Sequence, residues 1–413
     1  MQNNRILYFL CCEVQLFILI FPFITLFSTL NVKPAYVIIE VLSYLLLFLS
    51  VLYILYRRQR FNYKEHYPLL IFLFFILLSI LWVEPFLLSD SLYLTSRTII
   101  TILQTYVVIE ILAAKHTNLL SLLKKYAVII AIASLIFIIL FPGLSLSDLE
   151  GRYQSFFPAP NSLGQIIAFA FIIINLYDRK KNSFLFLLFI NSILIYQAIL
   201  SDSMTSITGA VICFLVYKFR FLFKPLFIAV IIIGLLTPLL SFLYMNYTEN
   251  LEIGSRDLTF TGRNEIWEIL IVDMLKTNKL GLGFGYAGYW GIEDYSIFSS
   301  INHLFYKPHQ GHNGFIDIWV HLGFVGLGLY LLFLSDFIKK LFKKTSSINI
   351  VFSLIILLIF INNITETSLF RIKDIYFIIF MLMYWYVKST KKVPAIQPRK
   401  SHSQRNNINE SIK

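Results

Sequence analysis

Charged side chains are scarce in this chain of 413 residues. Asp, Glu, Lys and Arg make up only 14% of it, whereas hydrophobic residues make up 58%. Water-soluble domains usually contain about 25% charged residues, so the composition excludes a string of soluble domains. Apolar runs close to the ~20 residues that a helix needs to cross a bilayer recur along the sequence. The sequence therefore predicts an all-α polytopic membrane protein.

Cysteine is scarce as well. Cys11, Cys12 and Cys213 fall inside or at the edges of apolar runs. This excludes a disulfide framework and any metal site built on paired cysteines. The apolar run from Ile6 to Leu30 is longer than the core of a signal peptide and has no small-residue cleavage site, so we expect it to remain as the first helix.

The apolar runs predict about 12 transmembrane helices. They are expected at residues 6–30, 34–56, 67–83, 97–114, 122–142, 161–177, 183–200, 203–217, 221–244, 313–334, 347–364 and 374–388. With the N-terminus inside, 25 of the 35 Lys and Arg residues fall on the cytoplasmic side. The positive-inside rule then places both termini in the cytoplasm. The net charge of +12 thus belongs to loops and does not indicate nucleic-acid binding.

This topology divides the chain into four parts. We expect nine helices in residues 1–244, a large extracytoplasmic loop with an amphipathic helix at 245–312, three helices in 313–388, and a basic, disordered cytoplasmic tail at 389–413. The sequence has no internal repeat, and nearly all its ionisable groups lie at the predicted outer surface. Transporters tend to have repeated halves and ionisable groups near the bilayer midplane, so this arrangement argues against transport.

Three glutamates are exceptions because they fall inside apolar runs. Charge inside a bilayer is costly and often functional, so Glu13, Glu40 and Glu110 are candidates for a mechanistic role. Glu13 and Glu110 lie near cytoplasmic ends, however, where their carboxylates can reach water.

The predicted outer loop contains the stretch TFTGRNEIWEILIVDMLKTNKLGLGFGYAGYWG. Apolar residues recur at helical spacing from Arg263 to Lys279, which predicts an amphipathic helix with Arg263 in its first turn. A cation there opposes the helix dipole. Either a nearby glutamate compensates it, or it binds an anion with the free amides of the helix start. The glycines that follow lack the Lys-Ser/Thr of a nucleotide-binding loop and favour turns.

A second arginine precedes a predicted helix in EGRYQSFFPAPNSLGQ. Asn161 or Ser162 is a candidate cap for that helix, so Arg152 is expected beside its start. A lone surface arginine is usually only solvated. Two arginines near helix starts on one face favour an anion site.

The stretch YKPHQGHNGF leads into the predicted span at 313–334. Asn313 or His312 lies at the start of this helix, where Asn is a favoured cap and His an interfacial residue. Alternatively, one imidazole could serve as a general base. His309 and His312 are also spaced for a metal, but no cysteine or carboxylate ligand accompanies them, so we predict no metal. The late stretch NNITETSLFRIKD places Glu366 and Arg371 on the same face, where they could orient or pair with the other groups.

Together these segments resemble the O-antigen ligase and O-antigen polymerase superfamily of bacterial membrane glycosyltransferases. The resemblance covers roughly residues 150–370, where the Arg152 loop, TGRNEIW, GLGFGYAG, HNGFIDIWVHLGFVG and NNITETSLF occur in the family's order. It implies metal-independent transfer of a glycan from an undecaprenyl diphosphate carrier to an acceptor hydroxyl, without a cofactor. Direct displacement at the anomeric carbon would invert its configuration.

The resemblance also implies roles for individual residues. Arg152 and Arg263 would hold the diphosphate, and His312 would deprotonate or orient the acceptor. Asn313 matches the residue beside that histidine, whereas His309 has no counterpart. Family members often have a basic residue in the stretch that matches LSDSMTSITG, where this chain has Met204. Arg97 or Arg371 would have to replace it at the diphosphate.

We therefore expect a polymerase of lipid-linked repeat units for O-antigen, capsule or exopolysaccharide. It would be a multi-pass protein of the bacterial cytoplasmic membrane with its active site on the extracytoplasmic face. The expected partners are the undecaprenyl diphosphate-linked oligosaccharide, an acceptor glycan and membrane lipid, with a chain-length regulator and a flippase as further candidates. The alternatives are a ligase that transfers glycan to lipid A core or protein, and a flippase or exporter of the same saccharides.

Overall fold

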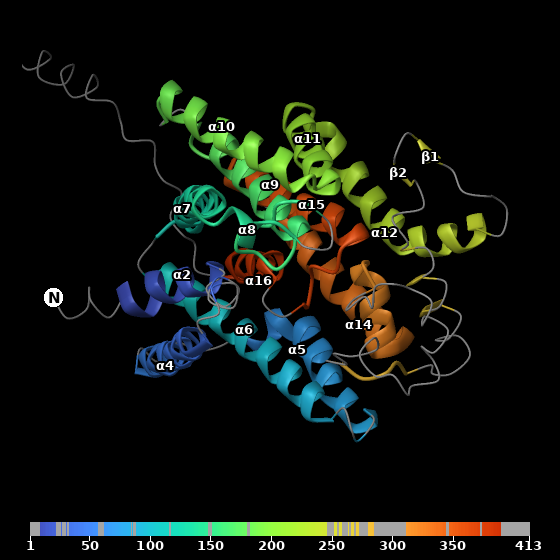
Figure 1. Ribbon diagram of the computed structural model, residues 1–413. Helices are drawn as coiled ribbons and strands as arrows, with labels where there is room; N and C mark the ends of the chain where they lie inside the picture. The colour runs from blue at the N-terminus through green and yellow to red at the C-terminus, as the bar shows by residue number, and fades with distance from the viewer. Residues whose placement is uncertain are drawn as a thin grey trace, which may run out of the picture.

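The structure is a computed structural model, and it is almost entirely helical (Figure 1). It describes residues 9–21, 26, 30, 33–56, 62–83, 85, 88–114, 117–147, 151–179, 182–245, 252–253, 256–257, 263, 266–267, 270–271, 280–284, 311–343, 347–371 and 374–389. The strands in this part of the chain are two short segments, β1 (Glu252–Ile253) and β2 (Arg256–Asp257), which pair antiparallel.

Most of the helices are long and apolar. They are α2 (Gln15–Ile20), which continues the π-helical Phe9–Val14, then α4 (Lys33–Tyr56), α5 (Tyr63–Leu78), α6 (Leu88–Ala114), α7 (Leu119–Leu140), α8 (Pro142–Ser145), α9 (Pro160–Leu176), α10 (Phe184–Ser201), α11 (Met204–Lys218), α12 (Phe223–Met245), α14 (Gly314–Lys343), α15 (Ser347–Thr365) and α16 (Ile375–Lys388). Short 3-10 helices at Ser79–Trp82 and Arg220–Leu222 adjoin α5 and α12.

Each expected span from 34–56 onward overlaps one of these helices. In the described part of the chain, seven helices are long and apolar enough to cross a membrane, and four shorter ones are also apolar. These features identify a polytopic membrane protein. The number of crossings and the cytoplasmic placement of both termini remain predictions, as do the boundaries of the four parts.

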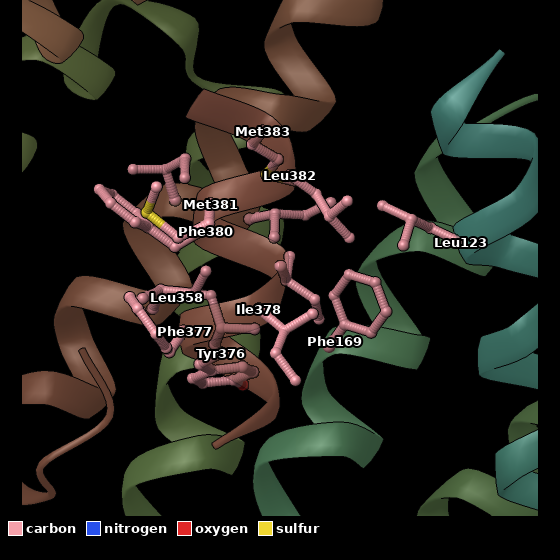
Figure 2. Packing of buried hydrophobic residues seen from close by; sticks show 14 of the residues in the cluster. Leu123, Phe169, Leu358, Tyr376, Phe377, Ile378, Phe380, Met381, Leu382 and Met383 are labelled. Atoms are coloured by element: carbon pink, nitrogen blue, oxygen red, sulfur yellow. The ribbon is translucent and has the colours of Figure 1, made fainter. Parts of the chain in front are cut away.

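The centre of the bundle is formed by α15 and α16, which other helices surround (Figure 1). Side chains on every side of α16 are buried, as expected of a helix that is hydrophobic all round. Figure 2 shows α16 packed with Leu358 of α15, Phe169 of α9 and Leu123 of α7, through Tyr376, Phe377, Ile378, Phe380, Met381, Leu382 and Met383. By contrast, α4 lies at one edge and exposes apolar side chains such as Ile38 and Leu55, as a lipid-facing helix would.

Helix α14 is broken at Gly323, although the sequence predicted an uninterrupted span at 313–334. Gly323 has φ 64° and ψ −168°, outside the helical region. Backbone from the outer-loop sequence fills the break, because Leu282 N–H donates to the Val320 carbonyl at 2.9 Å and Gly283 N–H to the His321 carbonyl at 2.8 Å. Irregular backbone in a membrane protein needs such internal partners.

We call residues Gly281–Phe284 the clip. Its other side is held by the 3-10 helix Ser79–Trp82 and by α6, because Phe284 N–H donates to Ser79 Oγ at 2.9 Å and Ser91 Oγ donates to the Phe284 carbonyl. Gly281 and Gly283 have positive φ, and a Cβ on Gly281 would lie 2.5 Å from the Gly323 nitrogen. The glycine-rich stretch therefore fastens the outer-loop sequence to the bundle, which adds to its expected role in turns.

Candidate active site

Glu366 is the centre of a polar cluster at the end of the bundle where α9, α14 and α16 begin and α15 ends, which we call the entry end. It directly follows α15, and its side chain is only 9% exposed. Its Oε1 accepts hydrogen bonds from Arg263 Nη2 at 2.5 Å and from Asn161 Nδ2 at 2.7 Å. Its Oε2 lies 3.2 Å from His312 Nδ1.

The turn after α15 holds this carboxylate in position. Asn363 Oδ1 accepts hydrogen bonds from the backbone N–H groups of Ser368 and Leu369, both at 3.2 Å. Asn362, its neighbour, accepts from Ser206 Oγ of α11 at 2.8 Å. The two asparagines of NNITETSLF thus fix the turn and connect it to another helix.

Arg152 joins the cluster through Asn161. Its guanidinium donates to Asn161 Oδ1 at 3.4 Å and to the carbonyls of Ser201 and Asp202 at 3.3 and 3.0 Å. The prediction that Asn161 or Ser162 caps the helix is wrong, because α9 begins at Pro160 with Ala159 as its N-cap residue. In the first turn of α9, the Asn161 side chain is instead placed to bridge Arg152 and Glu366.

His312 is held in an uncommon backbone conformation just before α14. Its φ is +52°, a region that costs a residue other than glycine about 1–3 kcal/mol unless the surroundings enforce it. Here Asn313 enforces it, because its Oδ1 caps the helix by accepting from Phe315 N–H at 2.9 Å and Ile316 N–H at 3.2 Å. The capping role predicted for Asn313 is confirmed.

The amide of Asn313 also reaches neighbouring helices. Its Nδ2 donates to the carbonyls of Gly234 and Ile364, at 3.0 and 3.1 Å. The residue beside His312 therefore ties the start of α14 to α12 and to the end of α15.

Asp317 is a positioning residue that the sequence reading missed. It is buried one turn into α14, where its Oδ1 accepts from Gly311 N–H at 2.9 Å and its Oδ2 accepts from Thr367 Oγ1. The Gly311 carbonyl accepts from Trp267 Nε1 at 2.6 Å. Asp317 thus connects the residues next to His312 and Glu366. A carboxylate in the apolar run FIDIWV was the available signal.

The outer-loop helix is described only in part. Arg263 and residues 266–267 and 270–271 are helical, and Ile266, Trp267, Leu270 and Ile271 are buried, so the predicted apolar face is confirmed there. The rest of the predicted helix to Lys279, its glutamates and His309 lie outside the described residues. Packing of this face places Arg263 against Glu366.

Electrostatics keep Glu366 ionised. Burial alone raises the pKa of its carboxyl group, but the hydrogen bond to His312 and the positive charges of His312, Arg263 and Arg371 outweigh burial and lower that pKa to about 2. An ionised carboxylate can only accept hydrogen bonds, so Nδ1 of His312 carries the proton in the pair. In the neutral ring the lone pair is then on Nε2, the nitrogen that could act as a base.

Of the remaining sequence candidates, Arg371 and Met204 lie near this cluster, whereas Arg97 has its ion-pair partner on another helix. Arg371 is exposed and acts on Glu366 through its charge. Arg97 of α6 pairs with Glu40 of α4 and donates to Tyr93 Oη at 2.8 Å. Met204 begins α11, next to the Ser201 and Asp202 carbonyls that Arg152 binds. In the described part of the chain no group of three or more metal-ligand side chains occurs.

The arrangement suits an anion and a proton acceptor side by side. Arg263 contacts the Glu366 carboxylate and Arg152 contacts Asn161, which bonds to the same carboxylate, so two guanidinium groups lie near the N-terminus of the 17-residue helix α9. Guanidinium groups and helix N-termini are favoured phosphate ligands. His312 and Arg263 contact the same carboxylate, that of Glu366. A base and a cation could therefore act on one bound substrate.

Comparison with known proteins agrees with the motifs. Residues 186–331, from α10 to α14, match the family model described as O-antigen ligase, and this part includes Arg263 and His312. A protein of Rickettsia typhi that has the provisional name of polysaccharide ligase is 26% identical over 176 residues, which are 41% of this chain and 43% of that protein. The chain thus matches less than half the length of this relative. These findings confirm the resemblance to the O-antigen ligase and polymerase superfamily.

Proposed function

We propose that this protein is a polymerase of lipid-linked oligosaccharide repeat units. It would transfer a glycan from undecaprenyl diphosphate to a sugar hydroxyl, with the entry end on the extracytoplasmic face of a bacterial cytoplasmic membrane. The observation that carries the proposal is the cluster around Glu366, whose carboxylate contacts His312, Arg263 and Asn161, with Arg152 on the other side of Asn161. No nucleotide sugar is present outside the cytoplasm, so the donor there must arrive already activated on a lipid.

The groups divide between the two sides of the scissile bond. Nε2 of His312 takes the proton of the acceptor hydroxyl, while Glu366 holds the ring in the required tautomer. The acceptor oxygen forms a bond to the anomeric carbon from the face opposite the leaving group, so the configuration inverts. The bond from this carbon to the phosphate oxygen breaks, and its electron pair leaves with the diphosphate.

The arginines act on the leaving group. Negative charge grows on the diphosphate as the bond breaks, and fixed cations at that position stabilise it. A guanidinium has five N–H donors, so Arg263 can hold Glu366 and a phosphate oxygen together. Arg152 contacts Asn161 and is held in place by the backbone carbonyls of Ser201 and Asp202, which belong to the LSDSMTSITG stretch. No metal or cofactor takes part in this mechanism.

A ligase is the second candidate, and the comparisons favour it by name. The matching family model is described as O-antigen ligase, and the relative has the name of a polysaccharide ligase. A polymerase and a ligase would use the same lipid-linked donor and differ in the acceptor. The cluster around Glu366 therefore suits either enzyme, and identifying the acceptor would distinguish them.

Reconstitution tests the proposal. The purified protein, in EDTA and without nucleotide sugars, is given an undecaprenyl diphosphate-linked repeat unit, and products are measured by mass spectrometry. We expect a ladder at multiples of the repeat unit, lost in His312→Ala and Arg263→Ala. Arg220→Ala, an exposed arginine outside the cluster, is the matched control and should retain the ladder.

Other outcomes reject the proposal in distinct ways. An undiminished ladder in His312→Ala would show that His312 is not the base. An intact donor that is consumed only when lipid A core is added would identify a ligase. An intact donor under both conditions would favour a flippase or exporter.

A further inference from the structure

A cavity of about 270 Å³ lies at the entry end, next to the cluster around Glu366 but separate from it. It is bounded by α2, α4, α6, the first turns of α9, and the segment that leads into α16. Ser162 and Gln165 line it, shortly after Asn161, and so does Arg371, shortly after Glu366. Arg152, Arg263, His312 and Glu366 do not line it. The proposed transfer step leaves this cavity without a role.

The cavity contains an ion pair between two membrane helices. Glu40 of α4 and Arg97 of α6 have side chains only 19% and 12% exposed, and they contact each other. Charged groups in membrane-spanning helices are costly, and they usually mark a binding or transport path. Arg371 and Asp374 line the cavity on the side of α16.

The remaining wall of the cavity combines polar side chains, such as Ser43, Thr101 and Gln104, with many apolar ones. Ile18 and Phe21 of the α2 region, Ile39 of α4, Ile100 of α6, and Ile375 and Ile378 of α16 contribute to it. Two arginines beside these apolar side chains suit a molecule with an anionic head and a hydrocarbon chain. The Glu40 carboxylate holds the Arg97 guanidinium in place before a phosphate arrives.

We propose that this cavity binds the head-group end of a second polyprenyl diphosphate, the carrier of the acceptor saccharide. The inference rests on the proposed polymerase function. In such a polymerase the reacting hydroxyl is on the terminal sugar of the acceptor, and the rest of the repeat unit separates it from its own diphosphate. The acceptor's carrier must therefore bind on the same membrane face as His312 but at a distance from that residue. The cavity is in such a position.

The same argument separates the two candidate functions. A protein acceptor has no polyprenyl chain, and lipid A core has its own anchor in another lipid. A second polyprenyl diphosphate site is required only when both substrates are lipid-linked repeat units. Occupation of the cavity by this carrier would therefore favour polymerase over ligase.

Lipid counting by native mass spectrometry tests the proposal with the full-length protein and undecaprenyl diphosphate as the probe. Ile100→Trp fills the cavity, whereas Leu103→Trp, one turn further along α6, adds the same ring to an exposed position. We expect two bound carriers in the wild type and in Leu103→Trp, and one in Ile100→Trp. Ile39→Trp, which fills the cavity from α4, should also leave one carrier if Ile100→Trp does not fold.

A kinetic measurement keeps this proposal distinct from the proposed function. Ile100→Trp should raise KM for a lipid-linked acceptor about tenfold but leave transfer to a soluble, lipid-free repeat-unit saccharide unchanged. His312→Ala should lose both transfers. If His312→Ala retained transfer to the soluble saccharide, the proposed function would fail while the lipid count still tested the cavity.

Three results would overturn the cavity proposal. The first is two bound carriers in both filled variants. The second is loss of transfer to the soluble saccharide in folded Ile100→Trp, which would mean that the cavity belongs to the reaction centre. The third is that phosphatidylglycerol, given at equal concentration, displaces the second carrier, which would make the cavity a site for bilayer lipid.

Discussion

The two ends of the central helices each contain a carboxylate with a cationic partner, but the two sets are built differently: Glu366 is buried, whereas the side chain of Asp336 is 30% exposed and its partner Lys388 is buried. At the entry end, Glu366 takes hydrogen bonds from Arg263 and Asn161 and pairs with His312. At the opposite end, Asp336 of α14 pairs with Lys388, the last residue of α16. Lys388 Nζ also donates to the Glu65 carbonyl of α5 at 2.8 Å.

The difference indicates that the Asp336–Lys388 pair is structural, whereas Glu366 and its partners are available for chemistry. Lys388 has a fully buried side chain with a carboxylate and a carbonyl as partners, so the pair joins three helices. Glu366 instead has more than one cation beside it, at a helix N-terminus and beside a cavity lined by Arg371. An excess of positive charge around one carboxylate favours a further anion.

The largest expected effect is on turnover at the entry end. Glu366→Gln removes the charge that fixes the His312 tautomer, and because general-base catalysis contributes roughly 10²–10⁴-fold, we expect transfer to fall at least about a hundredfold. Steady-state transfer in proteoliposomes measures this. Lys388→Met should retain turnover per folded molecule, and equal losses in the two variants would contradict the comparison.

The opposite end should respond in stability. Asp336→Asn leaves the buried Lys388 ammonium without its carboxylate, which typically costs about 3–5 kcal/mol. Thermal unfolding in detergent should show this loss, with transfer by the folded fraction unchanged. The double variant Asp336→Leu, Lys388→Met removes both charges and should recover part of the stability. No recovery would mean that the pair interacts differently from a buried salt bridge.

An intermediate effect is expected at the clip. A methyl group on Gly281 would meet the backbone of His321 and Gly323 at a positive φ, so Gly281→Ala stores strain of about 1–3 kcal/mol and should lower transfer about tenfold by displacing the attached Arg263 helix. Gly328→Ala, in α14 with open space around it, is the matched control. If transfer fell equally in both variants, the clip would have no special part in holding the site.

The smallest effect is a dependence on pH. Because the folded pKa of Glu366 lies below its ordinary value, its contribution to stability is complete above pH 4.5 and is lost as the pH falls towards 2. The difference in unfolding free energy between wild type and Glu366→Gln should be constant from pH 7 to 5 and shrink below about pH 4.5. A difference that already shrinks near pH 6 would show that the partners of Glu366 do not hold its pKa down.

The positions of the helices could be predicted from the sequence because hydropathy is a local property. Every span expected from residue 34 onward overlaps a helix, including α16, which has only 14 residues. A helix of this length spans about 21 Å, less than the ~30 Å hydrocarbon core. Hydropathy did not show that α16 is buried on all sides or that α14 is broken at Gly323, because both depend on distant neighbours.

The site was predictable to the extent that its residues lie next to helix ends. Arg152, Arg263, His312 and Glu366 are each near a predicted boundary, and the structure brings them together. Asn161 was missed because its hydrogen-bond partner, Glu366, is 205 residues away. Arg97 was expected at the diphosphate, but its partner is Glu40, and only the packing of α4 on α6 shows this.

The clip has a consequence for variation in the outer loop. The chain is fastened at Phe284 by Ser79 and Ser91, and again at Gly311 by Trp267 and Asp317. Residues 285–310 therefore start and finish at fixed points. Doubling the length of a closed loop costs only about 0.6 kcal/mol in closure entropy. This stretch is a place where segments from other enzymes could be grafted, and acceptor preference altered, without moving Arg263 or His312.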